Sequence, residues 1–291
     1  MNKSIYSAVI AGIMTCVAVA QAAPLPAELK MPGDRSWKGT IISRDGDWIE
    51  FSTGGKPIRI GASTIDELVF EVKIDSYKLN EMNRNREYAR IIGALERTLA
   101  PYKEYSDIRS NLTTYNALLM EMHYKTASYG KAIELASRIV LDDRDPKLQE
   151  QARVYSVLSL IGAGKLDKAE ALITAYGWTE GLDDTASPQK LYIMAKLLTL
   201  KKQYADAMEL VAKVVAFNSQ DPEWMQPAEL LCAEVYTELK MYDSAEEVIR
   251  QISLLYGNTN EDDQAQKLKI RIEKLRAEQE LEEEATESEE V

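Results

Sequence analysis

A short pattern returns at a nearly constant interval along this chain, and no other feature constrains the fold as strongly. The segments YGKA, LDKA, YADA and YDSA begin at residues 129, 166, 204 and 242, which are 37, 38 and 38 positions apart. In each segment an aromatic residue or Leu stands three positions before an Ala. A pattern with a period of about 20 to 50 residues indicates a repeat protein, in which one small unit is stacked on copies of itself.

The residues around each copy follow the period of a helix. From Ala132 the apolar residues stand at offsets 0, 1, 4, 7 and 8, and the copy that starts at Ala207 repeats these offsets. Such offsets fall on one face of a helix with about 3.6 residues per turn. A second apolar segment precedes each copy: NALLMEMHYKT, RVYSVLSLIGA, KLYIMAKLLTL and ELLCAEVYTEL. Each unit is therefore predicted to consist of a helix, a tight turn and a second helix.

These units resemble the tetratricopeptide repeat family. In that family a Tyr closes the turn between helix A and helix B, and a small residue lies where the two helices touch. The turn-closing position is matched by Tyr129, Leu166, Tyr204 and Tyr242, and the contact position by Ala132, Ala169, Ala207 and Ala245. Tyr88 and Ile91 match the same two positions in a degenerate copy at the front. The resemblance covers residues 77–257 and implies a right-handed helical solenoid with a concave groove.

The N-terminal part of the chain reads differently. Residues 23–33, APLPAELKMPG, show no periodicity and are predicted to be a linker. Residues 34–73 contain short β-prone segments, and Asp45-Gly46 between two of them is a strong hairpin signal. This segment resembles SH3-like or Sm-like small barrels through Gly-x-Ile, Asp-Gly and Ile-x-Phe. The predicted fold class is mostly α, a solenoid that resembles tetratricopeptide arrays preceded by a small antiparallel β module.

The two ends of the chain carry their own signals. Lys3 precedes an apolar run from about Ile5 to Ala20, and Ala20-Gln21-Ala22 is a small-x-small cleavage site. Residues 1–22 are therefore predicted to be a secretory signal cleaved after Ala22, which places the protein in the periplasm. An uncleaved anchor and a lipoprotein acylated at Cys16 are the alternatives. At the other end, residues 258–284 are expected to form a capping helix and residues 285–291 an acidic disordered tail.

The net charge argues against two classes of partner, and the cysteine content argues against an intramolecular disulfide. The formal net charge is −12. An acidic chain without a basic stripe argues against nucleic acid or anionic lipid as the partner. Cys232 is the one cysteine left after cleavage, so no intramolecular disulfide is expected.

No residue pattern typical of catalysis or of metal binding is recognisable. His123 is the only histidine, and with one mature cysteine it cannot supply a nitrogen–sulfur metal site. The acidic segments LDDRDP, 141–146, and NEDDQ, 260–264, lack the spacing of a calcium loop and suit helix ends. The sequence contains no phosphate-binding glycine loop and no serine nucleophile motif. We therefore expect no enzyme activity, no cofactor and no metal.

The resemblance implies that helix A lines the groove, and it names the candidate partner-binding residues. These are Glu121, Tyr124, Lys125, Val154, Leu158, Ile161, Tyr192, Lys196, Glu234 and Thr237. No Asn is among them, which argues against the carboxylate clamp of some family members. Tyr124 and Tyr192 are predicted to be partly exposed anchors for the partner. Trp48 shares a strand face with Glu50, so it should point outward, either to dock on the first repeat helices or to contact a partner.

Together these features predict an exported interaction scaffold or adaptor of the cell envelope. Its groove would bind a protein or peptide partner. The alternative is a carbohydrate- or nutrient-binding protein of the periplasm.

Overall fold

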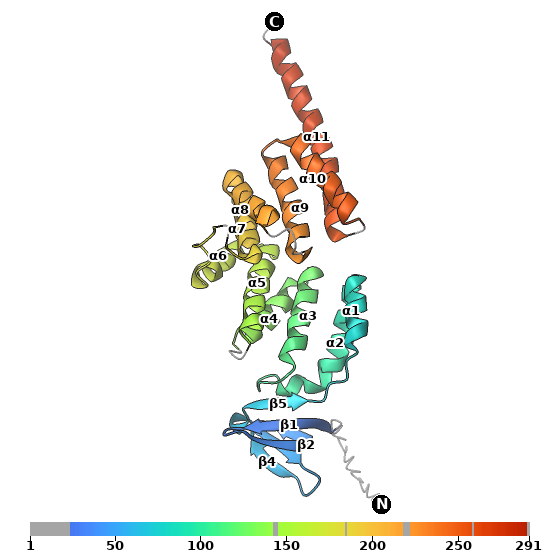
Figure 1. The fold of residues 1–291 in the computed structure, drawn as a ribbon, viewed down its shortest axis with the longest axis vertical. Helices are drawn as coiled ribbons and strands as arrows, with labels where there is room; N and C mark the ends of the chain where they lie inside the picture. Colours follow the sequence, from blue (N-terminus) through green and yellow to red (C-terminus); the bar gives the residue numbers. More distant parts are fainter. Residues whose placement is uncertain (1–23, 142–144, 184, 218–221, 258, 290–291) are drawn as a thin grey trace, which may run out of the picture. The chain divides into compact units, whose positions relative to one another are not determined.

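The structure is a computed structural model that describes residues 24–141, 145–183, 185–217, 222–257 and 259–289 (Figure 1). The predicted signal peptide, residues 1–22, and the last two residues of the predicted tail lie outside them. The described chain is mostly helical, with an antiparallel sheet at its N-terminal end, which confirms the predicted fold class. Two compact units are present. Among the described residues, one unit holds 24–77 together with Ala94–Thr113, and the other holds Lys78–Gly93 together with the described chain from Thr114 on.

Among the described residues, five strands form one sheet with the order β4-β3-β2-β1-β5. They are β1 (Leu25–Met31), β2 (Arg35–Asp45), β3 (Trp48–Ser52), β4 (Ile58–Gly61) and β5 (Glu67–Phe70). The prediction that residues 23–33 form a linker is therefore wrong, because β1 lies between β2 and β5. Pro26 obscured this strand. It stands near the start of β1 and precedes Ala27–Lys30, the stretch that pairs with β5. At this position the missing N–H of proline disturbs the hydrogen bonds between the strands least.

One face of the sheet carries the core of this unit. Ile49 and Phe51 on β3 are both fully buried, as the alternation in DWIEF predicts, whereas Trp48 is 50% exposed. On β5, Phe70 packs against the rings of Tyr102 and Tyr105, with centroid distances of 4.7 and 5.8 Å. Both tyrosines belong to the short 3-10 helix η2 (Ala100–Tyr105), which therefore covers part of that core.

The helical unit alternates two kinds of helix. The first helices of the repeated pairs are α3 (Thr113–Lys125), α5 (Pro146–Gly162), α7 (Pro188–Leu200) and α9 (Pro222–Glu238), and the second are α4 (Tyr129–Val140), α6 (Leu166–Ala175), α8 (Tyr204–Phe217) and α10 (Tyr242–Leu255). We call these A helices and B helices. Every B helix thus begins at the predicted turn-closing residue. In front stand α1 (Ser76–Arg84) and α2 (Tyr88–Leu99), and α11 (Asn260–Glu289) ends the chain.

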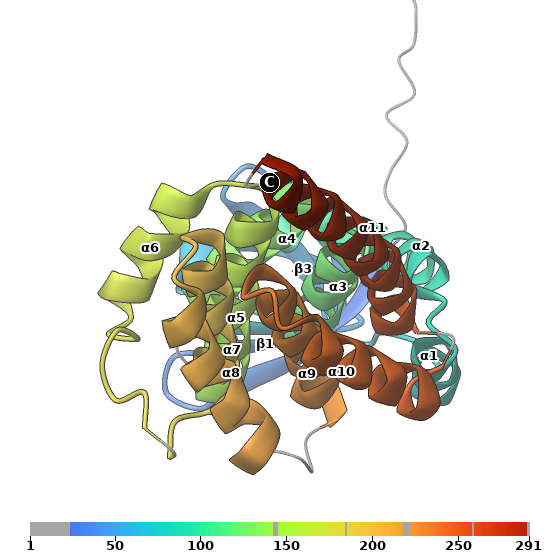
Figure 2. The same cartoon turned by 90° about the horizontal axis from the view of Figure 1, so that it is seen from above.

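The A helices pack side by side, and each of the last two B helices packs on its own A helix. Contacts join α5 with α7 and α7 with α9, while α8 packs on α7 and α10 on α9 (Figure 2). The four predicted contact residues, Ala132, Ala169, Ala207 and Ala245, have no exposed surface. A larger side chain at such a point would push the two helices apart.

A recurring turn, which sequence reasoning missed, joins each A helix to its B helix. Two positions before α2 and before each of the four B helices stands a residue with positive φ: Arg86 (58°), Ala127 (56°), Gly164 (70°), Lys202 (61°) and Lys240 (58°). The next N–H then donates to a carbonyl five residues earlier, as from Ser128 to His123 at 2.8 Å and from Met241 to Tyr236 at 2.9 Å. This is the Schellman motif, and the front pair α1–α2 has it too. Gly usually fills this position, and here it does so once.

Helix α11 extends the array beyond α9 and α10, on which it packs. The guanidinium of Arg276 lies 5.6 Å from the ring centroid of Tyr242, the turn-closing residue of the last pair. Tyr88 makes the same kind of contact with Lys125 of the next A helix, at 5.3 Å. Helix α11 therefore stands where a further A helix would stand. It also runs on to Glu289, so the prediction of a disordered tail from 285 is wrong for residues 285–289. This stretch has no Gly or Pro that would end a helix.

Candidate functional site

A cavity of about 460 Å³ opens in the helical unit, on the side lined by the A helices. Its walls come from α3, α5, α7 and α9, from the first residues of α2 and α4, from the turns before these two helices and from the first turns of α11. Six of the predicted partner-binding residues line it: Tyr124, Lys125, Leu158, Tyr192, Lys196 and Glu234. The A-helix register deduced from the repeats thus brings these side chains together in the structure.

One wall of the cavity is aromatic. Tyr124 stacks edge-on against Tyr155 at 5.3 Å between ring centroids, and it lies 6.1 Å from the ring of Tyr129. Next to them, Tyr192 packs against Trp224 at 5.8 Å. Tyr129 can approach because α5 carries Gly162 there, where a β-carbon would stand 2.5 Å from the tyrosine ring. These rings offer a rigid apolar surface with hydroxyl groups at its edge.

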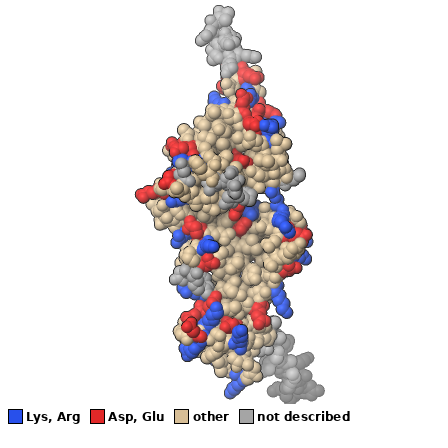
Figure 3. Space-filling model, in the orientation of Figure 1, with Lys and Arg blue, Asp and Glu red and all other residues tan. Residues whose placement is uncertain are grey.

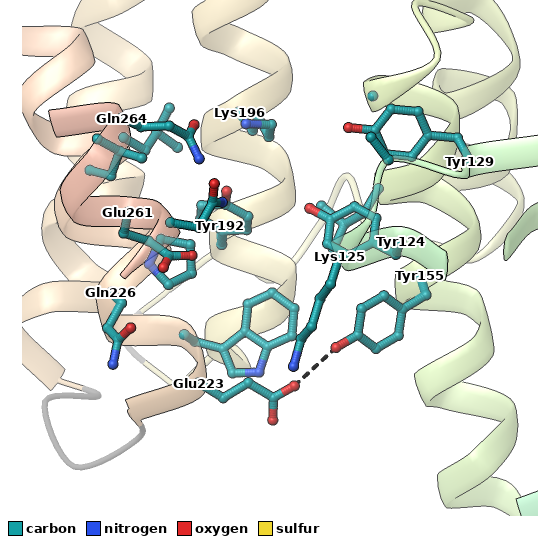
Figure 4. A pocket seen from close by; sticks show the side chains of 18 of the residues that line it. Tyr124, Lys125, Tyr129, Tyr155, Tyr192, Lys196, Glu223, Gln226, Glu261 and Gln264 are labelled. Carbon is teal, nitrogen blue, oxygen red and sulfur yellow. Dashed lines mark hydrogen bonds between the residues drawn. The ribbon is translucent and has the colours of Figure 1, made fainter. Parts of the chain in front are cut away.

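The opposite wall is polar. Figure 4 shows the tyrosines of α3, α4 and α5 on one side of the cavity, facing Gln226, Glu261 and Gln264 on the other. Glu261 and Gln264 are three positions apart, so both fall on the same face of α11. The start of that helix is fixed by Thr259, whose buried hydroxyl accepts a hydrogen bond of 2.8 Å from the N–H of Asp262.

Charged groups at the cavity are held by neighbours. The hydroxyl of Tyr155 donates to a carboxylate oxygen of Glu223 at 3.1 Å (Figure 4). The ammonium of Lys125 donates to Glu121 at 2.5 Å. On α7, the ammonium of Lys196 lies 5.8 Å from the ring centroid of Tyr192. Lys125, Lys196 and Glu223 therefore have protein partners before any ligand arrives.

Burial shifts the proton affinities of several lining groups. It raises the pKa of Tyr124 and of Tyr192 well above the ordinary value, so both hydroxyls keep their protons. Burial also raises the pKa of Glu234, although the positive charge of Lys196 opposes this effect. For Lys125, burial acts to lower the pKa, but the carboxylate of Glu121 outweighs it and the pKa lies above its ordinary value. The cavity thus keeps neutral hydroxyls beside a charged lysine.

The structure corrects two of the predicted site residues. Thr237 is 2% exposed, and its hydroxyl donates to the carbonyl of Ala233 at 2.8 Å, so it does not face the groove. Tyr192 is 5% exposed, which contradicts its prediction as a partly exposed anchor. The repeat register places Tyr192 on the face that lines the cavity but does not give its depth of packing between neighbouring helices, and for Thr237 it gives neither the face nor the depth. Glu121 reaches the cavity only through its bond to Lys125.

Sequence reasoning missed the wall contributed by α11 and by the start of α9. Glu261 and Gln264 were not among the candidates, because residues 258–284 were expected only to cap the array. Trp224 and Gln226 were missed because they precede the apolar segment ELLCAEVYTEL, which begins at residue 229. Trp48 lies in the other unit, where its ring is 5.5 Å from the guanidinium of Arg59. A partner contact at Trp48 stays a prediction.

The described residues contain no cluster of three or more His, Cys, Asp or Glu side chains that could hold a metal ion. His123 is buried among packing residues. Burial raises the pKa of the Cys232 thiol to about 11, and its sulfur lies 3.8 Å from that of Met208. Within the same described part of the chain, every helix is too short or too polar to cross a membrane. The sequence matches no protein-family model, and no curated protein matches it either.

Proposed function

We propose that this protein is an exported, non-catalytic adaptor of the cell envelope that holds a segment of another protein in the groove of its helical unit. The observation that carries the proposal is the pairing of an aromatic wall with an amide-bearing wall across one cavity. Side chains of the bound segment would pack on the half-buried rings of Tyr124 and Tyr129, and the buried ring of Tyr155 supports Tyr124 from behind. Its peptide groups would exchange hydrogen bonds with Gln226 and Gln264, whose amides both donate and accept.

The surface of the molecule is compatible with a protein partner. On the face shown in Figure 3, Lys and Arg side chains are interspersed with Asp and Glu side chains. A nucleic-acid-binding protein needs a run of cations that follows the phosphate backbone. The net charge of −12 also opposes binding to a polyanion.

Export rests on the N-terminal sequence alone. With residues 1–22 as a cleaved signal, the mature chain begins at Ala23. We expect osmotic shock to release it without detergent. N-terminal sequencing that found Met1, or an acylated Cys16, would contradict this part of the proposal.

The groove is tested by blocking it without disturbing its core. Replacement of Tyr124 or Tyr192 is unsuitable, because both pack against other rings and their loss would leave a cavity. Gln264 is exposed on α11 and lines the groove, so Gln264→Trp fills the space from the solvent side. The matched control is Glu278→Trp, at an exposed position of the same helix that does not line the cavity.

The probe is a random peptide library displayed on phage and selected on the purified mature chain. We expect the wild type and Glu278→Trp to bind the enriched peptides equally. Gln264→Trp should bind them at least about tenfold more weakly with an unchanged melting temperature, because the indole occupies their site. The proposal fails if no peptide is enriched, or if the enriched peptides bind Gln264→Trp as tightly as the wild type.

A further inference from the structure

The groove continues into a second cavity of different chemistry. This cavity has a volume of about 450 Å³ and lies between the ends of α7 and α9 and the middle of α11. Glu234 and Gln264 line both cavities, so the two adjoin and form one elongated groove. A compact ligand would fill only one of them. An extended chain would fill both.

The length of the groove can be estimated from α11, which borders both cavities. Its lining residues run from Asn260 in the first cavity to Arg271 in the second. Eleven residue steps of a helix span about 16 Å. An extended peptide rises about 3.3 Å per residue, so roughly five residues would cover this distance.

The second cavity differs from the first in its charge. Its lining includes Lys202, Lys267 and Arg271, against the carboxylates of Glu234 and Glu238. Glu238 is already engaged, because Arg271 approaches it to 2.7 Å and the Tyr204 hydroxyl donates to it at 3.1 Å. The positive charges at this end are therefore only partly compensated.

The two lysines are available to a ligand. Lys202 and Lys267 are both exposed, and within the described part of the chain neither takes part in an ion pair. Lys202 is held in the recurring turn with a φ of 61°, and Lys267 lies about two turns after the start of α11. In a chain with a net charge of −12, two such lysines beside an open cavity form a site for negative charge.

We propose that the bound segment is an extended peptide with a large apolar residue for the aromatic cavity and at least one Asp or Glu for the lysine cavity. The two features should lie within about five positions of each other, given the length of the groove. This inference rests on the proposed function and specifies its partner. The apolar residue would provide contact area, and the acidic residue would set the direction in which the segment lies.

The experiment compares the peptides enriched by three proteins from the same phage library. The test variant is Lys202→Glu/Lys267→Glu. The control is Lys269→Glu/Lys274→Glu, which makes the same change of charge at exposed positions of α11 outside both cavities. Wild type and control should enrich Asp or Glu near an apolar residue. The test variant should enrich Lys or Arg at that position, keep the apolar residue and bind the wild-type peptides at least about tenfold more weakly.

The outcomes separate this inference from the proposed function. Suppose Gln264→Trp abolishes binding but the peptides from all three proteins contain acidic residues equally often. Then the groove binds peptides and the proposed acidic specificity is wrong. If the library gives no groove-dependent peptide at all, the proposed function is wrong and this inference falls with it.

Discussion

The two compact units of this chain differ in how far apart in the sequence their contacting residues lie. In the sheet unit, Leu29 of β1 pairs with Leu68 of β5, and the Arg44 guanidinium binds the Asp107 carboxylate at 2.6 and 2.7 Å. In the helical unit, the extensive contacts join an A helix to its own B helix or to an adjacent pair, and the Tyr155–Glu223 hydrogen bond between α5 and α9 is a longer-range exception. The sheet unit therefore closes only when distant segments meet, whereas the helical unit can grow pair by pair.

The edge of β5 shows that the sheet unit depends on contacts that occur only once. Asn111 continues the edge of β5, because its side-chain amide donates to the Phe70 carbonyl at 3.0 Å and accepts from the Phe70 N–H at 2.9 Å. Each of these contacts occurs once. In the helical unit the turn and the alanine contact occur in several copies. Damage to one copy should spread only to its neighbours, whereas damage to a central strand should affect the whole sheet unit.

The largest expected loss of stability comes from disrupting the contact between the two helices of one pair. Ala207→Arg places a long charged side chain at a contact with no exposed surface, and should lower the free energy of unfolding by roughly 3 kcal/mol or more. Ala205→Arg, two residues earlier and exposed, should change it by less than about 0.5 kcal/mol. Urea denaturation followed by circular dichroism measures both. Equal midpoints would show that the assigned contact position is wrong.

A somewhat smaller loss of stability is expected from a substitution in the sheet unit. At Gly39 of β2 a β-carbon would stand 2.2 Å from the carbonyl oxygen of Ser52 and 2.8 Å from the ring of Phe51. Gly39→Ala should therefore cost about 2 to 3 kcal/mol, because the neighbouring strand must shift. We expect proteolysis to cut residues 24–77 faster while helical circular dichroism is kept. The control is Gly55→Ala, where an added β-carbon meets nothing within 4 Å. A parallel loss of helix would show that the units do not fold independently.

The same contrast explains how much of the fold could be predicted from the sequence. The B-helix starts were predictable because the pattern at Tyr129 is repeated at Tyr204 and Tyr242, so weak signals add up. Strand β1 was not, because its pairing partners lie elsewhere in the sequence and Pro26 reads as a linker signal. Long-range pairing leaves no local pattern in a single copy.

The candidate site was predictable to a similar degree. Tyr124, Lys125 and Lys196 follow from the face that the A helices share. Gln264 does not, because α11 matches no repeat in sequence although it stands where a further A helix would stand. The burial of Thr237 was missed because the depth of a side chain depends on the helices that pack around its own helix, here α8, α10 and α11 around α9.

A pH-dependent prediction concerns the last helix pair. Glu229 on α9 is buried, and burial raises the pKa of its carboxyl even though the Tyr256 hydroxyl donates to it. The folded state then holds this proton more tightly than the unfolded state, so Glu229 lowers stability as the pH rises above the ordinary pKa of about 4.3. Glu229→Gln should therefore raise the melting temperature near neutral pH and change it little near pH 4.

The control for this prediction has the opposite sign. Arg250 donates to the carboxylate of Glu247 and lowers the pKa of this exposed group. Its stabilisation is present above the ordinary pKa and is lost as the pH falls. Glu247→Gln should therefore lower the melting temperature slightly at neutral pH and not at low pH. If Glu229→Gln also lowers it at neutral pH, the carboxylate of Glu229 is stabilising and the sign assigned above is wrong.

The smallest expected effects come from three backbone changes, at Gly164, Gly130 and Lys240, each in a different helix pair. Gly164 has a φ of 70° in the recurring turn, so Gly164→Ala should cost about 1 kcal/mol because a side chain strains this backbone. Gly130 lies inside the first turn of α4 with nothing near its added β-carbon, so Gly130→Ala should stabilise by about 0.5 to 1 kcal/mol. Lys240→Gly should also stabilise, by a few tenths of a kcal/mol, because relief of strain at a φ of 58° slightly exceeds the entropy that Gly adds to the unfolded chain.

Because each turn is a local feature of one pair, the three changes should add in a combined variant. Thermal denaturation of the single variants and the triple variant tests this. A destabilising Gly130→Ala would place that glycine outside the helix, and strong non-additivity would show that the pairs are coupled beyond their neighbours.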